Sequence, residues 1–536
     1  MEKKDIVLVT GQSGINIKNC LKKIINDIPD LGVFSIDHEI EKILGQDFID
    51  ILGYPPKVLQ EYWDIAFKRI DNDISNSKNE NTIVSFHASY YHQQKRQFIS
   101  AVNFKKIYQW KQSRRIKSII VLIDDCYDIY MRLTSNGKMF NYINVLKPKE
   151  AIFHSVSNLI LILMWREIEL AFSQKIAQLL DIPIFVFAVK HSISLFNRLI
   201  EKRIEDLNIL YLSHPISSVR VAKESLNQDF NDELNEFIKM VLKNNPNLIL
   251  FIPDTIDEKR IIVEHEDSKR IFIPKLNSRW RLPFKSDQML FDPLPSDDSD
   301  DKEKPLNPHK YKNQDDKDSI SQTLSILNEK IGDQVNSRDI SLIEQSKNGI
   351  IIYRPCWEGF VASGVSIEVE YNCLLRKLNK IMGKGRKNLI IGTEDDIGKL
   401  RIRKLFSQIS YDIENCNINE LHRICNLWIE DPKKVLEFSS MHYNWAEIRK
   451  EIENFCPIDY TLYADEVGTL GPGRGLGKRN VNKKYWENLK EIIENTSIDY
   501  LEFDSIFDRK LVLSHSDESK YLINKKALEF VNKNLV

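Results

Sequence analysis

A glutamate in the second half of the chain, Glu368, stands where an α/β protein keeps its reactive groups. The apolar run 349–353 has the pattern of a buried parallel strand, a loop follows it, and residues 367–371 start a helix. Ligands of open α/β sheets bind beyond the carboxyl ends of strands, so a carboxylate in the first turn of the next helix faces that region. A carboxylate there can also simply complement the helix N-terminus. Taken alone, Glu368 leaves both interpretations open.

The segment around Glu368 resembles the nucleoside 2-deoxyribosyltransferase family and its nucleotide N-glycosidase relatives. Residues 364–370 read GVSIEVE, similar to the family pattern Gly-Val/Leu-Gly-x-Glu-Leu-Gly-x-Ala around the nucleophile, which puts the nucleophile on Glu368. The family's base-contacting aspartate, shortly before the preceding strand, matches Asp339. Its tyrosine at the end of the first strand matches Tyr211. The resemblance extends over about residues 205–395 and implies glycosidic chemistry in this part of the chain.

The sequence departs from the family pattern at several positions that surround the expected substrate. Ser213, His214 and Pro215 follow the first strand in place of small residues, and Ser366 replaces the second glycine of the nucleophile motif. Ala362 stands where some members carry a second acid. These departures concern the identity of the substrate more than the glycosidic chemistry.

Cleavage of an N-glycosidic bond passes through an oxocarbenium-like state at the anomeric carbon. A carboxylate meets that demand as a covalent nucleophile or as an electrostatic partner. With Glu368 in this role, Asp339 would bind or protonate the leaving base, and the Tyr211 hydroxyl would orient the glutamate. An arginine would bind a substrate phosphate. The expected substrate-binding residues are Arg338, Arg354, Ser213, Ser363 and Gly364. This chemistry requires no cofactor.

A second candidate site opens the chain. The apolar residues 6–9 predict a strand, and 10–19 (TGQSGINIKN) turn it into a helix, which is the layout of a phosphate-binding loop. The loop resembles that of P-loop nucleotide kinases, whose pattern is GxxxxGK[ST]. Here Asn16 replaces the second glycine, and the lysine comes one position late. Binding of ATP or another nucleotide with Mg²⁺, and a plain βα turn without ligand, both remain open. The nucleotide-binding residues would be Gly11, Ser13, Gly14, Lys18 and Asn19.

The N-terminal half continues with a kinase-like alternation of strands and helices. Strands are predicted at 33–36, 83–86, 119–123 and 184–189, and a long packing helix over 148–180. Asp124 and Asp125 follow one of these strands, where they would either hold magnesium or cap the next helix. His87 and His92 lack a third ligand with recognisable spacing, so no zinc site is predicted there.

We therefore predict an α/β chain in three parts. Residues 1–203 form a P-loop kinase-like parallel-sheet domain with a degenerate phosphate loop. Residues 204–395 form a flavodoxin-like, doubly wound parallel sheet that resembles the deoxyribosyltransferases. Residues 396–536 form a mainly helical region. Residues 292–318, acidic and rich in proline, are expected to be a mobile insertion. The glycine-rich residues 468–477 would be an anion-binding loop or a surface connection.

The bulk properties exclude several classes of protein. The net charge of −1 over 536 residues gives no field that would recruit nucleic acid or an anionic membrane. No apolar run is long enough to span a bilayer, and no signal peptide is evident. Seven cysteines without metal-type spacing indicate reduced thiols in a cytoplasm. The expected partner is a small nucleoside or nucleotide. The resemblance implies a homo-oligomer, because relatives often complete the pocket across subunits.

Three functions follow from these patterns. The first is an N-ribosyl or deoxyribosyl hydrolase or transferase that acts on a nucleoside, a nucleotide or an NAD-type substrate, with a nucleotide-binding N-terminal domain. Such an enzyme would deplete a nucleotide pool, for instance in defence against phage. The second is a regulatory or scaffold protein that senses nucleotides without turnover. The third is a nucleotide kinase that uses the N-terminal domain.

Overall fold

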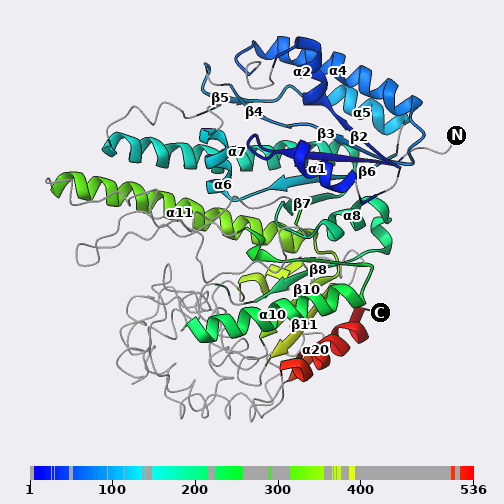
Figure 1. Ribbon diagram of the computed structural model, residues 1–536, viewed down its shortest axis with the longest axis vertical. Helices are drawn as coiled ribbons and strands as arrows, with labels where there is room; N and C mark the ends of the chain where they lie inside the picture. Colours follow the sequence, from blue (N-terminus) through cyan, green and yellow to red (C-terminus); the bar gives the residue numbers. More distant parts are fainter. Residues whose placement is uncertain are drawn as a thin grey trace, which may run out of the picture. The chain divides into compact units, whose positions relative to one another are not determined.

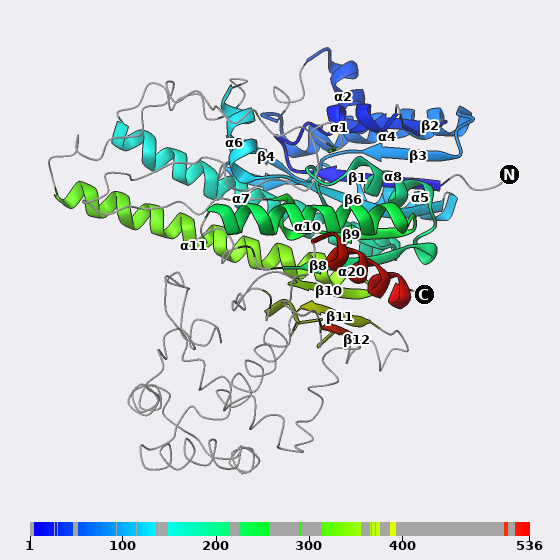
Figure 2. The same cartoon turned by 60° about the horizontal axis from the view of Figure 1, so that its bottom comes forward.

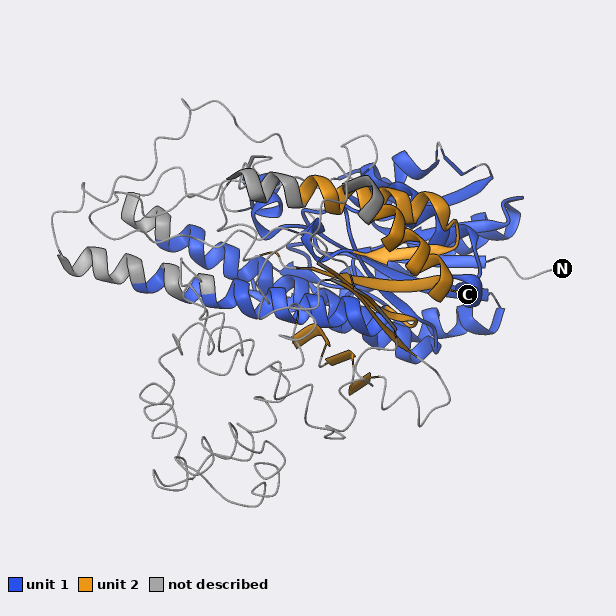
Figure 3. Cartoon of the chain, turned by 90° about the horizontal axis from the view of Figure 1, so that it is seen from below, with its two compact units in different colours: residues 1–207, 252–345 blue, residues 208–251, 346–536 orange. Residues whose placement is uncertain are grey.

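The computed structural model describes residues 5–256, 289–290, 314–354, 365–375, 386–392, 509–512 and 520–535, with shorter gaps inside the first and fourth of these ranges. The chain divides into two compact units, each assembled from segments far apart in the sequence (Figure 3). Unit 1 comprises residues 1–207 and 252–345, and unit 2 comprises residues 208–251 and 346–536.

Unit 1 is built on a parallel sheet of five strands in the order β2-β3-β1-β6-β7 (Figure 1). The strands are short apolar runs buried on both faces, as expected for a parallel sheet covered by helices. Their bounds are β1 Asp5–Gly11, β2 Leu31–Ser35, β3 Asn81–Ser85, β6 Arg115–Ile123 and β7 Ile184–Ala188. A two-stranded antiparallel hairpin, β4 Tyr90–His92 and β5 Gln97–Ile99, follows β3.

The helices of unit 1 form because their apolar residues recur at helical spacing. In α4, for example, Leu59, Trp63, Phe67, Ile70 and Ile74 are buried in the core with the sheet. Helices α7 and α11 lie side by side (Figures 1 and 2). The helix bounds are α1 Ile17–Ile25, α2 Ile36–Leu44, α4 Pro56–Asn76, α5 Phe104–Ser113, α6 Cys126–Ser135, α7 Pro148–Leu180, α8 Ile193–Glu201 and α11 Gln314–Gln345, with short 3₁₀ turns η2 Ile204–Asp206 and η3 Pro253–Thr255.

Unit 2 contains a second parallel sheet of five strands, in the order β12-β11-β10-β8-β9. The strands are β8 Asn208–Ser213, β9 Leu248–Phe251, β10 Gly349–Arg354, β11 Lys387–Gly392 and β12 Arg509–Val512. Gly349 has a φ of +111°, and a Cβ at this position would lie 1.8 Å from the Lys387 carbonyl oxygen. Only glycine therefore lets β10 begin so close to β11.

The strand register sorts the side chains of this sheet onto two faces. Tyr211, Ile350 and Asn388 are paired across β8, β10 and β11, so they form one row on one face. Tyr353 points to the other face, where its ring stacks on Phe237 with centroids 4.0 Å apart. Phe237 belongs to α10 Glu224–Asn244, which lies beside α20 Lys520–Leu535 (Figures 1 and 2). Helical residues between 365 and 375 follow β10.

The α/β class with parallel sheets, predicted from the sequence, is confirmed. The predicted helix over 148–180 coincides with α7. One prediction was wrong at its edge, because residues 314–318, assigned to the mobile insertion, are the start of α11. The acidic residues there suit a helix N-terminus, whose partial positive charge favours them. The rest of the insertion and the glycine-rich residues 468–477 lie outside the described residues, as does most of 396–536.

Among the helices that the structure describes, none has the length and apolar character needed to cross a membrane.

Candidate functional site

Glu368 lies on the helical segment that follows β10, and its side chain turns toward the sheet of unit 2. Only 7% of its surface is exposed. The same segment buries Val365, Val369 and Asn372. Glu368 is three residues after Val365 and four residues before Asn372, and Val369 is four residues after Val365. This spacing places them on one side of a helix. The local sequence therefore presents a carboxylate from the buried side of the helix.

Two hydroxyl groups from β8 hold the Glu368 carboxylate. The Tyr211 hydroxyl donates to Oε1 over 2.6 Å, and the Ser213 hydroxyl donates to Oε2 over 2.5 Å. Tyr211 and Ser213 are two residues apart on a strand, so they share a face, and both are fully buried. Hydrogen bonds donated to both oxygens favour the ionised carboxylate and fix its orientation.

The position of this carboxylate in the sheet matches where α/β proteins bind ligands. β8 pairs with β9 on one side and with β10 on the other, so the order of the strands reverses between β8 and β10. Such a reversal is a topological switch point, the usual ligand site of open α/β sheets. Tyr211 and Ser213 come from β8, and Glu368 from the helix after β10. The three side chains thus meet at the switch point.

The other site residues expected from the sequence belong to unit 1 or have side chains outside the described part of the chain. Asp339 and Arg338 belong to unit 1 and lie within α11, which precedes β10 in the chain. The Arg338 guanidinium donates to Asp339 Oδ1 from Nε at 3.0 Å and from Nη2 at 2.9 Å, and Nη1 donates to the Ile256 carbonyl at 2.8 Å. Arg354 is the last residue of β10, and its side chain is outside the description, as are Ser363 and Gly364.

In unit 1, the glycine-rich loop after β1 contacts residues of α6 and α7. The Asn16 side chain accepts from the Asn19 amide at 3.1 Å and so caps α1, at the position where a P-loop keeps its helix N-terminus open. A Cβ on Gly14 would lie 2.7 Å from Ile129 of α6, so α6 packs directly on the loop. Lys18 and Asn19 are exposed, and Ser13 is half-buried.

A carboxylate of the same unit binds the backbone amides around this loop. Glu169 of α7 accepts from the amides of Gly11 (3.2 Å), Ala88 (2.8 Å) and Ser89 (2.7 Å), and from the Ser89 hydroxyl (2.6 Å). Burial raises the pKa of Glu169. Nearby His87 and these hydrogen-bond donors act to lower it, but the net pKa is raised. Amides at the ends of β1 and β3 therefore form an anion-binding arrangement that Glu169 itself occupies.

Near Glu169 lies a largely buried pair of ionisable residues that follow β2 and β3 in the chain. His87 Nδ1 lies 2.7 Å from Asp37 Oδ2, and the Tyr90 hydroxyl donates to Asp37 Oδ1 over 2.9 Å. Burial acts to lower the pKa of His87. Asp37 outweighs it, with help from Glu169, and the net pKa is raised.

The three aspartates after β6 surround a lysine. Asp124, Asp125 and Asp128 bring their carboxylates within 4.8 Å of one another, which is close enough for a metal ion. The Lys190 ammonium lies among them, 3.4, 2.6 and 2.7 Å away in that order. Burial acts to lower the pKa of Lys190, but the aspartates raise it well above its ordinary value. The Lys190 ammonium thus occupies the position that a magnesium ion would take. Arg132 forms a second ion pair with Asp124.

Sequence reasoning missed the roles of Glu169 and Lys190. Lys190 comes directly after an apolar run, and Glu169 lies within the predicted packing helix 148–180. Burial of a charged residue requires partners of opposite charge or many hydrogen-bond donors. That rule was a usable signal, but it does not identify the partners. They come from the end of β1 and the residues after β3 for Glu169, and from the β6–α6 turn and the first turn of α6 for Lys190.

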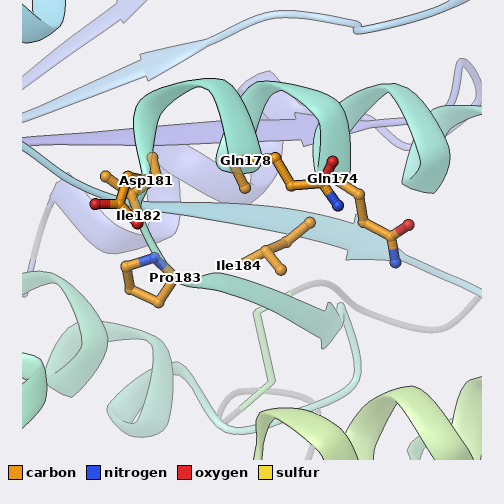
Figure 4. Close-up of a pocket in the computed structure, with 7 residues that line it drawn as sticks. Gln174, Gln178, Asp181, Ile182, Pro183 and Ile184 are labelled. Atoms are coloured by element: carbon orange, nitrogen blue, oxygen red, sulfur yellow. The ribbon is translucent and has the colours of Figure 1, made fainter.

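A surface hollow in unit 1 does not coincide with any of these groups. Figure 4 shows it between the end of α7 and the start of β7, and its lining residues are Gln174, Ala177, Gln178, Asp181, Ile182, Pro183 and Ile184. It lies at the amino end of β7, whereas Lys190 and Glu169 gather at the carboxyl ends of the strands. We assign it no function.

Comparison with models of known protein families finds no match, and comparison with curated proteins finds none.

Proposed function

We propose that this protein cleaves the N-glycosidic bond of a nucleoside, a nucleotide or an NAD-type substrate, as a hydrolase or a transferase, with Glu368 as the nucleophile. The observation that carries the proposal is the buried Glu368 carboxylate with a hydroxyl donor on each oxygen. A carboxylate held in one orientation by donors that favour its ionised form is suited to attack, or to stabilise, a developing oxocarbenium ion.

The strand order of unit 2 supports a flavodoxin-like fold for this part of the chain. Numbered along the unit, β8, β9, β10, β11 and β12 are strands one to five, and their order in the sheet is 2-1-3-4-5. This is the order of the flavodoxin-like doubly wound sheet, whose ligand lies at the switch between strands one and three. Glu368 follows strand three, and its hydroxyl donors come from strand one.

The chemistry proceeds in two steps. Glu368 attacks the anomeric carbon, a C–O bond forms as the C–N bond to the base breaks, and the base leaves with a proton from a general acid. Water then attacks the same carbon in hydrolysis, or a second base does so in transfer, and the Glu368 carboxylate is released. Tyr211 and Ser213 hold the carboxylate throughout. We assign the contact with the base to Asp339 on the resemblance alone.

Nucleotide binding by unit 1 is a separate part of the proposal. A phosphate at the loop 11–19 would have to compete with contacts that unit 1 makes itself, since Glu169 binds the Gly11 amide and Asn16 caps α1. We therefore propose a binding role for this unit rather than phosphoryl transfer.

The test is release of free base by the full-length protein. Nucleosides, nucleotides and NAD are incubated with the wild type, and the products are separated by chromatography. Glu368→Gln keeps shape and hydrogen bonding but removes the nucleophilic charge, so release should fall by orders of magnitude while substrate binding persists. The matched control is Glu233→Gln, a buried glutamate near Tyr353 on the other face of the same sheet. Equal losses in both variants, or full activity in Glu368→Gln, would refute the assignment.

A further inference from the structure

We propose that Asn372 is a positioning residue that fixes the orientation of the helix carrying Glu368. The catalytic consequence rests on the proposed function, but the structural part does not. Asn372 follows Glu368 by four residues, so the two side chains lie on the same side of the helix, one turn apart. Asn372 is fully buried, which is uncommon for an asparagine and requires partners for its amide.

Both ends of the Asn372 amide are engaged by residues at the start of β11. Its Nδ2 donates to Asn388 Oδ1, and its Oδ1 accepts from Arg386 Nε at 2.9 Å. Asn388 is fully buried and Arg386 is 5% exposed. Since hydrogen bonds depend strongly on direction and apolar contacts do not, this buried set fixes how the helix is rotated over the sheet.

The register of the sheet shows why this matters for Glu368. Tyr211 on β8 and Asn388 on β11 flank Ile350 of β10 in one row. The helix is therefore attached on both sides of β10, by Glu368 to β8 and by Asn372 to β11. A rotation or shift of the helix that breaks the Asn372 contacts also moves the Glu368 carboxylate relative to its two hydroxyl donors.

Small displacements of a nucleophile have large kinetic effects, and a misplacement of about 1 Å can cost about 10²-fold in rate. We expect Asn372→Ala to lower kcat for base release by about this factor with little change in KM, because the substrate contacts remain. Asn372→Asp retains the acceptor for Arg386, and the Asn388 amide can turn to donate to it, so this variant should recover most of the rate. Asn388→Ala should lower kcat in the same way, because it removes the partner of Asn372. It replaces Asn372→Ala as the test if that variant fails to fold.

The matched control is Asn524→Ala. Asn524 is also a fully buried asparagine of unit 2, but it accepts from the Tyr353 hydroxyl at 2.6 Å on the opposite face of the sheet. Its loss should lower the denaturant midpoint as Asn372→Ala does, while kcat stays near that of the wild type. Equal kinetic losses in the two variants would mean that Asn372 acts only through global stability.

A second measurement does not depend on activity. Unfolding in urea is followed for Asn372→Ala, Tyr211→Phe and the double variant, and then for Asn372→Ala combined with Tyr353→Phe. If Asn372 positions Glu368 against Tyr211, the midpoint shift of the first double variant is smaller than the sum of its single shifts, whereas the second pair is additive. Additivity in both pairs overturns the proposal. Coupling without base release by the wild type would leave the positioning intact and refute the glycosidic function alone.

Discussion

The Tyr211 hydroxyl and the Glu368 carboxylate, 157 positions apart in the chain, meet over 2.6 Å at the strand-order reversal of unit 2. The opposite face of the same sheet carries a related arrangement, in which the Tyr353 hydroxyl contacts Glu233 at 3.3 Å and Asn524 at 2.6 Å. The two tyrosines are equally buried. One unit therefore contains both the candidate catalytic pair and a matched pair for comparison.

The first prediction compares these two tyrosines. Tyr211→Phe and Tyr353→Phe each remove a buried, hydrogen-bonded hydroxyl, so each should lower the free energy of unfolding by about 1–3 kcal/mol. Only Tyr211→Phe should lower kcat for base release, by about 10²-fold, because only Tyr211 orients Glu368. Urea unfolding and chromatographic assays of both variants check this. A similar kinetic loss in Tyr353→Phe would show that activity follows stability.

The strands were predictable from the sequence, whereas the partners of the buried charges were not. The runs around Val7 and Ile351 are apolar without interruption, and strands of that kind are typical of parallel sheets buried on both faces. The contact of Tyr211 with Glu368 was expected only from the resemblance, since no local pattern joins residues so far apart. Lys190 follows β7, whereas its three aspartates follow β6. These two strands are neighbours only in the folded sheet.

The second prediction concerns the pH dependence of stability. The raised pKa of folded His87 means that the Asp37–His87 ion pair stabilises the protein fully below the ordinary histidine value of 6.5. This stabilisation should be lost as the pH rises from that value through the raised pKa, because the folded protein gives up its proton later than the unfolded chain. The free energy of unfolding, measured in urea at a series of pH values, should decline over this range.

The control for this effect keeps the imidazole and changes its partner. Asp37→Asn removes the charge that raises the pKa of His87, so the decline should flatten. Tyr90→Phe removes the hydrogen bond that the Tyr90 hydroxyl donates to Asp37 but retains the ion pair, so the decline should persist. A slope that is the same in all three proteins would contradict the assignment to His87.

The third prediction concerns the buried lysine among the aspartates. Lys190→Met leaves Asp125 and Asp128 without the ammonium that lies 2.6 and 2.7 Å from them, so the free energy of unfolding should fall by about 3–5 kcal/mol. Lys42→Ala is the control, because Lys42 is 58% exposed in its pair with Glu39 and such surface pairs contribute little. Thermal and urea unfolding distinguish the two.

The same variant tests whether the aspartates bind a cation when the lysine is absent. Three carboxylates within 4.8 Å provide oxygen ligands suited to Mg²⁺. Added Mg²⁺ should therefore raise the melting temperature of Lys190→Met and leave that of the wild type unchanged. Stabilisation of the wild type by Mg²⁺ would mean that Lys190 is displaced and that the aspartates are a metal site after all.

The last prediction concerns the loop after β1. A phosphate-binding loop of the P-loop kind needs free amides, an open helix N-terminus and a lysine directed at the phosphates. In unit 1 the Gly11 amide binds Glu169, Asn16 caps α1, and Lys18 is exposed on α1. ATP hydrolysis by the full-length protein should therefore be low or absent, and any binding of ATP should be nearly the same in Mg²⁺ and in EDTA. Lys18→Ala should behave like Lys22→Ala, a second exposed lysine of the same helix. Rapid hydrolysis that is lost in Lys18→Ala but kept in Lys22→Ala would show instead that the loop rearranges, releases its amides from Glu169 and transfers phosphate.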